Sequence, residues 1–220
     1  ANAIINPNLR GCDFPSKNLA GVGVCFYLFS SLKTYLTKQG YFEKNNIQNP
    51  DLRTLLDLVA LGTVADVVKL DQNNRILVNE GIKRIREKRC SKGILAILEL
   101  TKRPVDSLQA SDLGFTVAPR INAAGRLSDI SQGIRCLLSD DMNDARRYAQ
   151  TLEEFNIKRR KEQKRMQDEA LAIVEDQAID KSDFAIVLFD ESWHEGVVGI
   201  VAGKLKETYQ CPSAVFAKAD

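Results

Sequence analysis

Histidine occurs only once in these 220 residues, at His194. This scarcity excludes a histidine-rich metal site built from this chain alone. Catalysis by a Ser-His-Asp triad would have to run through His194, and the sequence has no Gly-x-Ser-x-Gly elbow to accompany it. The composition therefore argues against a serine hydrolase and against a zinc site of the histidine-rich kind.

Cysteine pairs and long hydrophobic runs are absent as well. The cysteines are widely spaced, odd in number and without a Cys-x-x-Cys pair: Cys12, Cys25, Cys90, Cys136 and Cys211. This pattern predicts reduced thiols in a cytoplasm, most of them serving as small packing residues. The longest apolar stretches, 55–68 and 196–202, are too short and too interrupted to cross a bilayer. No charged-then-apolar leader opens the chain, so we expect a cytoplasmic protein without a membrane partner.

The remaining composition is that of an ordinary globular protein, with 44% hydrophobic and 27% charged residues. The net charge of +2 neither requires nor excludes nucleic acid, because phosphate binding needs only a local basic stripe. Ile4 and Ile5 resemble the end of a strand, and the apolar run 213–217 lies almost at the other terminus. We therefore expect an internal part of a longer protein.

Periodicity and capping residues predict an α/β protein. Helices are expected at residues 17–36, 52–65, 75–86, 93–101, 130–138, about 140–178 and 197–209. Strands are expected at residues 115–118, 184–189 and 213–217. The last two strands and the helix between them form a βαβ-like unit. Ser16 is the expected N-cap of the first helix, and we attribute its Gly21-Val22-Gly23 to close packing against another helix.

Asp66 stands alone as the charged residue of an apolar stretch, residues 60–68. A carboxylate taken out of water is costly unless it is paired, hydrogen-bonded or bound to a cation. The local sequence leaves two interpretations open. Asp66 is either a capping or turn-forming residue, or a ligand of a metal ion.

Longer motifs carry a resemblance to a known family. Residues 56–68 (Leu-Asp-Leu-Val-Ala-Leu-Gly-Thr-Val-Ala-Asp-Val-Val) closely resemble the fourth motif of the DHH phosphoesterases, in the form found in their single-strand-specific DNA exonucleases. The likeness continues in the same order at residues 6–8 (Asn-Pro-Asn), 12–24, 119–127 (Pro-Arg-Ile-Asn-Ala-Ala-Gly-Arg-Leu) and 193–202 (Trp-His-Glu-Gly-Val-Val-Gly-Ile-Val-Ala). These stretches span nearly the whole chain, so together they are stronger evidence for the resemblance than any one of them alone.

The resemblance implies a site of two divalent ions, Mn²⁺ or Mg²⁺, held by aspartates and histidines and suited to phosphodiester cleavage. Asp66 matches the ligand of the fourth motif, so it is the expected catalytic and metal-binding residue of this chain. The Asp-His-His triplet and a later Gly-Gly-His motif are absent from the 220 residues. We therefore expect most of the metal site to lie outside this chain, and the chain alone to be inactive.

Residues 119–126 are expected to form a loop that contacts phosphate. Arg120 and Arg126 can each bind a phosphate through two N–H groups, with Asn122 in support. The alternative is a surface turn with two solvated arginines. The resemblance favours the DNA-binding interpretation without deciding which arginine matters more.

Two further places are expected to contact DNA. The long helix is apolar at both ends of one face and polar in the middle, where Asn156 and Arg159 stand out from an otherwise solvated basic run. His194 precedes a helix whose first N–H groups can hold an anion, and its alternative role is that of a helix cap. Trp193 is expected to pack rather than to stack on a base.

The resemblance implies the C-terminal part of a DHH-type parallel-sheet domain at residues 1–139, a long connecting helix at 140–178, and the start of a DHHA1 domain at 179–220. It implies a 5′–3′ exonuclease that degrades single-stranded DNA in repair and recombination. Its partners beyond DNA would be repair proteins such as a single-strand-binding protein or a helicase. The alternatives are another DHH phosphodiesterase, of the oligoribonuclease or cyclic-dinucleotide type, and a catalytically dead DHH scaffold that binds DNA.

Overall fold

The computed structural model describes residues 3–176 and 184–218. The chain divides into two compact units, one formed by residues 1–119 with 134–150 and the other by residues 120–133 with 151–220. Helices predominate, and a small parallel sheet in the second unit makes the fold α/β, as predicted. Within the described residues, no helix is both long and apolar enough to span a membrane.

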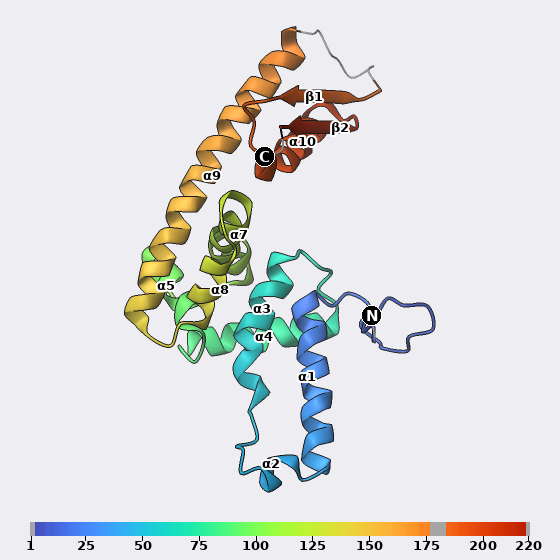
Figure 1. Cartoon of the computed structure of the whole chain (residues 1–220), viewed down its shortest axis with the longest axis vertical. Helices are drawn as coiled ribbons and strands as arrows, with labels where there is room; N and C mark the ends of the chain where they lie inside the picture. Colours follow the sequence, from blue (N-terminus) through green and yellow to red (C-terminus); the bar gives the residue numbers. More distant parts are fainter. Residues whose placement is uncertain (1–2, 177–183, 219–220) are drawn as a thin grey trace. The chain divides into compact units, whose positions relative to one another are not determined.

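In the described part of the first unit, the regular elements are all helical and follow an irregular segment at residues 3–20 (Figure 1). These elements are α1 (Gly21–Lys38), α2 (Tyr41–Lys44), a 3-10 turn (Leu52–Leu55), α3 (Leu56–Ala65), α4 (Gln72–Arg86), α5 (Lys92–Leu100), α6 (Ala110–Asp112) and a π-helical turn (Leu113–Val117). Three helices have residues in both units: α7 (Ala118–Leu127), α8 (Ser131–Leu138) and α9 (Met142–Asp176). The helices predicted at residues 52–65, 75–86, 93–101 and 130–138 are confirmed to within a few residues.

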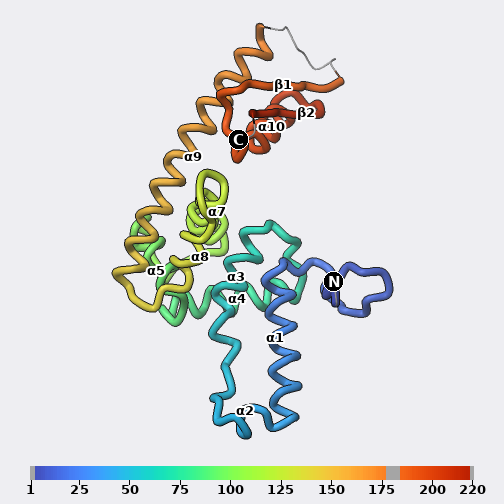
Figure 2. The backbone as a smooth tube through the Cα atoms, viewed as in Figure 1, coloured from blue at the N-terminus to red at the C-terminus, as the bar shows by residue number. Residues whose placement is uncertain are grey.

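Helix α3 packs tightly on both α1 and α4. A Cβ placed on Gly62 would lie 2.7 Å from Val22 Cγ1, and one placed on Gly81 would lie 2.2 Å from the Leu56 carbonyl oxygen. Gly21, by contrast, faces open space. The close packing expected at residues 21–23 therefore exists, but the glycine that permits it belongs to α3. Figure 2 shows the chain descending along α1 and returning through residues 45–55 to α3.

Two predictions near the start of the chain are wrong. Helix α1 begins at Gly21 with Ala20 as its N-cap, and the Ser16 hydroxyl instead donates a hydrogen bond to the Asp71 carboxylate at 2.9 Å. The residues around Ile4 and Ile5 form no strand, and both side chains are largely exposed. Isolated apolar pairs and single hydroxyl residues carry too little periodicity to locate an element boundary.

The strand expected at residues 115–118 and the loop expected at 119–126 are also wrong, because both stretches are helical. The π-helical turn leads directly into α7, and the buried side chains recur at three- and four-residue spacing: Leu113, Thr116, Val117, Arg120, Ala123 and Ala124. Pro119 has no N–H to donate, and the widened π turn falls just before it. Four β-prone residues in a row were too short a window to tell a strand from a buried helix.

The second unit is built on the C-terminal half of α9 and a βαβ motif. Strands β1 (Ile186–Asp190) and β2 (Ser213–Ala217) pair in parallel around α10 (Glu195–Tyr209), as predicted. Two buried stretches follow α9 at three- and four-residue spacing, one of Ala145, Ala149, Leu152 and Asn156 and one of Met166, Ala170 and Val174, with Met166 ten positions after Asn156. The long helix is therefore confirmed through residue 176, and its expected end at 178 lies outside the described residues.

Candidate functional site

Asp66 lies at the C-cap of α3, where its N–H donates to the Gly62 carbonyl at 3.0 Å. Its side chain is exposed and forms no hydrogen bond or ion pair with any described residue. The carboxylate is therefore not withdrawn from water, which corrects the premise drawn from its apolar neighbours. The backbone of Asp66 occupies the capping position of the first interpretation. Its carboxylate oxygens remain available to a metal ion, as the second interpretation requires.

A divalent ion would not find a complete site around Asp66 within the described residues. Carboxylate oxygen is a preferred donor for Mg²⁺ and Mn²⁺, but such ions take about six ligands. No group of three or more histidine, cysteine, aspartate or glutamate residues in the described part of the chain could hold a metal. Asp66 therefore fits the chemistry of the implied ions, and the rest of such a site would have to come from other residues.

Arg120 has a different environment from the one predicted. It is 8% exposed, and its Nε lies 2.5 Å from a carboxylate oxygen of Glu153 on α9. Breaking a buried pair by removing one partner costs about 3–5 kcal/mol. This geometry makes Arg120 a residue that fastens α7 to α9, whereas Asn122, two residues later, is exposed.

The end of α7 touches the start of α10 in the second unit. The Arg126 guanidinium donates to the Gly196 carbonyl at 3.1 Å, and a Cβ on Gly196 would lie 2.1 Å from the Arg126 carbonyl oxygen. His194 is the N-cap of α10, because its Nδ1 accepts the Gly196 N–H at 3.0 Å. In the neutral ring Nε2 then carries the proton and remains a donor. The capping role of His194 is thus realised and leaves Nε2 for a second partner.

Asn156 and Arg159 contact each other on α9, on the face where the sequence singled them out. Arg159 Nη2 donates to Asn156 Oδ1 at 3.1 Å, and its Nη1 donates to Gln163 Oε1 at 2.8 Å. Both acceptors are neutral, and no carboxylate contacts this guanidinium within the described residues. Burial and the positive charges of Arg160 and Arg126 lower the pKa of Arg159 below its usual value. An arginine held by neutral groups beside a second arginine is poised to attract an anion.

A polar depression of about 700 Å³ in the second unit brings several of these residues together. Its lining includes Arg126 and His194, which the sequence singled out, and Lys158, Arg165 and Lys218, which it did not. Arg165 is engaged by Glu162 and Glu169, and these carboxylates raise its pKa further. Lys158 forms no ion pair with described residues and is one helical turn from the depression's Glu162. Lys158 belongs to the basic run 158–161, and the sequence alone did not indicate that Lys158 faces this depression.

Trp193 packs, as predicted. It is 3% exposed, and its Nε1 donates to a Glu169 carboxylate oxygen at 2.8 Å. It anchors the turn that carries His194 against α9, and it does not offer a ring face to a base.

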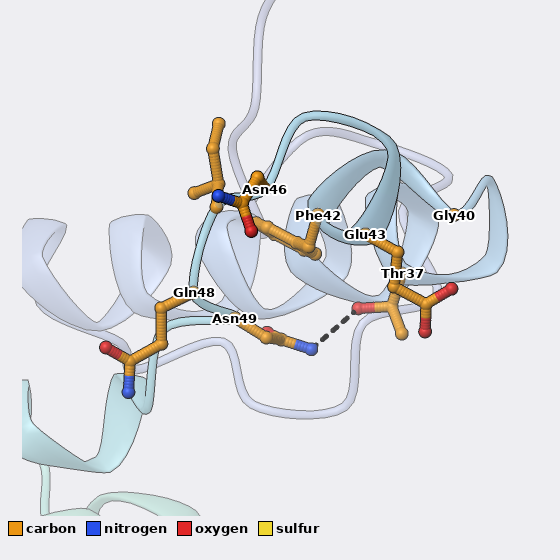
Figure 3. Close-up of a pocket in the computed structure, with 8 residues that line it drawn as sticks. Thr37, Gly40, Phe42, Glu43, Asn46, Gln48 and Asn49 are labelled. Carbon is orange, nitrogen blue, oxygen red and sulfur yellow. Dashed lines mark hydrogen bonds between the residues drawn. The ribbon is translucent and has the colours of Figure 1, made fainter.

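A separate pocket of about 450 Å³ lies at the tip of the first unit (Figure 3). Polar side chains line it together with Phe42 and Ile47, and Asn49 Nδ2 donates to Thr37 Oγ1 at 3.2 Å. The pocket sits at the Lys38 end of α1, whereas the Gly62–Val22 contact places α3 near the other end. At 1.5 Å per residue, the 18-residue helix separates these ends by roughly 26 Å. This pocket is therefore remote from Asp66.

Comparisons with known proteins match the whole chain. It is 51% identical over 221 residues to the single-stranded-DNA-specific exonuclease RecJ of Escherichia coli, and 36% identical over 214 residues to that of Bacillus subtilis. The matches cover 100% and 97% of this chain, but only 38% and 25% of those proteins. The chain thus spans between about a quarter and little more than a third of the length of the curated relatives it matches. No family model matches it.

Solved structures agree with the curated relatives. The crystal structure of RecJ with Mg²⁺ from Thermus thermophilus matches with a TM-score of 0.77 and 32% identity, over 96% of this chain and 31% of that one. A manganese-bound exonuclease RecJ matches with a TM-score of 0.76 and 32% identity, over 96% and 49% of the two chains. The resemblance inferred from the motifs, and the α/β fold that it implied, are confirmed.

Proposed function

Because this chain is similar along its whole length to one part of the RecJ exonucleases, we propose that it contributes to a metal-dependent exonuclease that degrades single-stranded DNA from the 5′ end. The observation that carries the proposal is the 51% identity across all of the chain. The matching relatives are named single-stranded-DNA-specific exonucleases, which favours this function over the alternatives, a dinucleotide phosphodiesterase and an inactive scaffold. A role in repair and recombination, in the cytoplasm, follows from the same resemblance.

Asp66 is the proposed metal ligand of this chain. Its exposed carboxylate, with no partner among the described residues, supports this assignment. Divalent ions in such a site lower the pKa of a bound water and stabilise the charge that develops on phosphate. In the full-length protein, Asp66→Ala should lower cleavage at least about a hundredfold, because one ligand of the site is lost. An unchanged rate at saturating Mn²⁺ would remove Asp66 from the site.

Arg126, Arg159 and His194 are the proposed phosphate contacts, with Asn156 orienting Arg159. Three features support them: the neutral partners of Arg159, the charge of Arg126 beside it, and the free Nε2 of His194. Asn122, which is exposed, is proposed as a further contact. Arg120 was also expected to contact DNA; because its guanidinium forms an ion pair with Glu153, its proposed role is instead to hold α7 against α9.

Binding measurements test the phosphate contacts. Arg159→Met keeps most of the side-chain volume and removes the charge, so it should weaken binding of a single-stranded oligonucleotide about 10- to 100-fold. The slope of log affinity against log salt should fall by about 0.7, the value for one phosphate contact to a single strand. Arg160→Met, the exposed neighbour, is the matched control. Equal losses for the two variants would show that only net charge matters.

Protein partners belong to the proposal as well. A single-strand-binding protein or a helicase would supply the substrate, since both act where single strands are exposed. Co-purification of the full-length protein with either, resistant to nuclease treatment, tests this part. Loss of the association after nuclease treatment would show that DNA alone links them.

A further inference from the structure

The turn that carries Asp66 joins α3 to α4 and contains a strained residue. Val67 has φ of 53° and is 88% exposed, although β-branched residues avoid the left-handed region. Such a conformation persists only where the surrounding structure holds it. The residues that hold this turn therefore decide where the Asp66 carboxylate points.

Asn74, in the first turn of α4, is fully buried beneath this turn. Its Nδ2 donates to the Lys69 carbonyl at 2.9 Å and to the Asn18 carbonyl at 2.8 Å. Its Oδ1 has no hydrogen-bond partner among the described residues. A flipped amide would set that oxygen against two carbonyls, so the orientation is settled by the contacts. The two donors join the Asp66 turn to the segment before α1.

Asp71, the N-cap of α4, completes the connection. One carboxylate oxygen accepts the Asn74 N–H at 2.9 Å, and the other accepts from Ser16 Oγ at 2.9 Å and Asn18 Nδ2 at 3.1 Å. The Asp71 N–H in turn donates to the Lys69 carbonyl at 2.9 Å. The backbone on both sides of the turn is thereby tied to residues 16–18, more than fifty positions earlier.

We propose that Asn74 and Asp71 are positioning residues that hold the Asp66 carboxylate where a divalent ion would bind. Neither residue needs to touch the ion, because both act through the backbone of residues 66–71. The inference rests on the proposed function in one respect, the role of Asp66 as a metal ligand. It assigns to Ser16 and Asn18, in the motif at residues 12–24, the task of bracing this turn.

Amide hydrogen exchange tests, without any metal, whether the hydrogen bonds of Asn74 and Asp71 hold this turn. Asn74→Asp replaces the two N–H donors by an acceptor at almost unchanged volume, so exchange at the Asp71 amide should be at least about tenfold faster. Exchange in the centre of α4 should stay unchanged. Asn79→Asp, on the exposed side of the same helix, adds the same charge and is the control. Ser16→Ala removes a single donor and should give a smaller acceleration, which keeps the test usable if Asn74→Asp fails to fold.

Metal dependence in the full-length protein tests the positioning. Asn74→Asp should raise the Mn²⁺ concentration for half-maximal cleavage about tenfold, with KM for single-stranded DNA unchanged, below the temperature where unfolding begins. A purely structural residue would change the thermal midpoint and leave the Mn²⁺ dependence as it was. That outcome, with Asp66→Ala still impaired, overturns the positioning role alone. Normal Mn²⁺ dependence in Asp66→Ala would instead remove Asp66 from the metal site, the one part of the proposed function on which this inference rests.

Discussion

At the scale of single residues, Val67 shows what a sequence cannot disclose. Its neighbours predicted a buried aspartate next to it, and nothing in Ala-Asp-Val-Val indicates a left-handed valine. That conformation is imposed by the turn into α4 rather than preferred by the residue. The identity of Asp66 was predicted from the motif, but its exposure depends on this backbone and could only be seen in the structure.

Replacing Val67 should stabilise the protein. Asn tolerates the left-handed region, so Val67→Asn should raise the free energy of unfolding by about 0.5–1 kcal/mol, the smaller part of the 1–2 kcal/mol that the conformation costs. Urea denaturation with an unchanged m-value would measure the gain. Val68→Asn, where φ is negative, should bring no gain. Equal effects at both positions would contradict the assignment of strain to Val67.

Thiol reactivity should follow burial. Burial raises the pKa of Cys90 to about 12, with the Asp57 carboxylate adding to the rise, and raises that of Cys136 to about 11. Both groups are therefore protonated at pH 8, where iodoacetamide needs the thiolate. We expect mass spectrometry to find the exposed Cys25 alkylated first and these two protected. Alkylation of Cys90 at the rate of Cys25 in the folded chain would contradict its burial.

At the scale of elements, the helices with a clear apolar period were predictable and residues 113–127 were not. A run of Phe, Thr and Val favours a strand, but the burial of Leu113, Val117 and Ala124 follows a helix. Tertiary packing chose between them, because α3 and α5 supply the surfaces against which the π-helical turn packs. The two-stranded sheet was predictable, since its short apolar strands flank one amphipathic helix.

The contact between α3 and α4 should be intolerant of a single methyl group. Gly81→Ala would press a Cβ to 2.2 Å from the Leu56 carbonyl, a backbone atom that cannot rotate away, and should cost about 1–3 kcal/mol of stability. Gly203→Ala in α10 meets open space and should stabilise by about 0.5–1 kcal/mol. Thermal unfolding of both variants checks the pair. A harmless Gly81→Ala would mean that the two helices separate at little cost.

The start of α4 should lose stability in acid. Hydrogen bonds from the Asn74 backbone, and then from Asn18 and Ser16, lower the pKa of Asp71 below its usual value of 3.8. A group with a lowered folded pKa contributes stability above its unfolded pKa and loses it as pH falls through the folded one. Asp71→Asn should therefore be less stable than the native chain at pH 7, and the difference should shrink below about pH 4. Urea midpoints of both proteins at several pH values measure this difference. A difference that does not change with pH would show that the charge of Asp71 is irrelevant.

At the scale of the whole molecule, the purified 220-residue chain should not cleave DNA. Asp66 offers one ligand, and the described residues assemble no group of three. A 5′-labelled single-stranded oligonucleotide incubated with this chain and Mn²⁺ should therefore stay intact. Any trace of degradation should be equal in a control that contains the heat-denatured chain. Digestion that Asp66→Ala abolishes would show that this chain completes a site by itself.

For the candidate site, the sequence predicted which residues to consider but not what surrounds them. The identities of Asp66, Arg126, Asn156, Arg159 and His194 came from motif and spacing. Their surroundings did not: Glu153 neutralises Arg120, and Lys158 emerges from a basic run, only once α7 and α9 are packed. Ion-pair partners that lie more than thirty residues apart leave no local signal in the sequence. The sequence therefore cannot show which arginines already form an ion pair within the protein.

The contact between α7 and α10 has a consequence for how homologous sequences vary. The Gly196 backbone lies so close to the Arg126 carbonyl that a Cβ would come within 2.1 Å of it, whereas Gly199 and Gly203 have open space around them. Over evolutionary time, position 196 should remain glycine in every lineage that keeps the His194 cap. Positions 199 and 203, three and seven residues further along the same helix, should drift freely to alanine or serine.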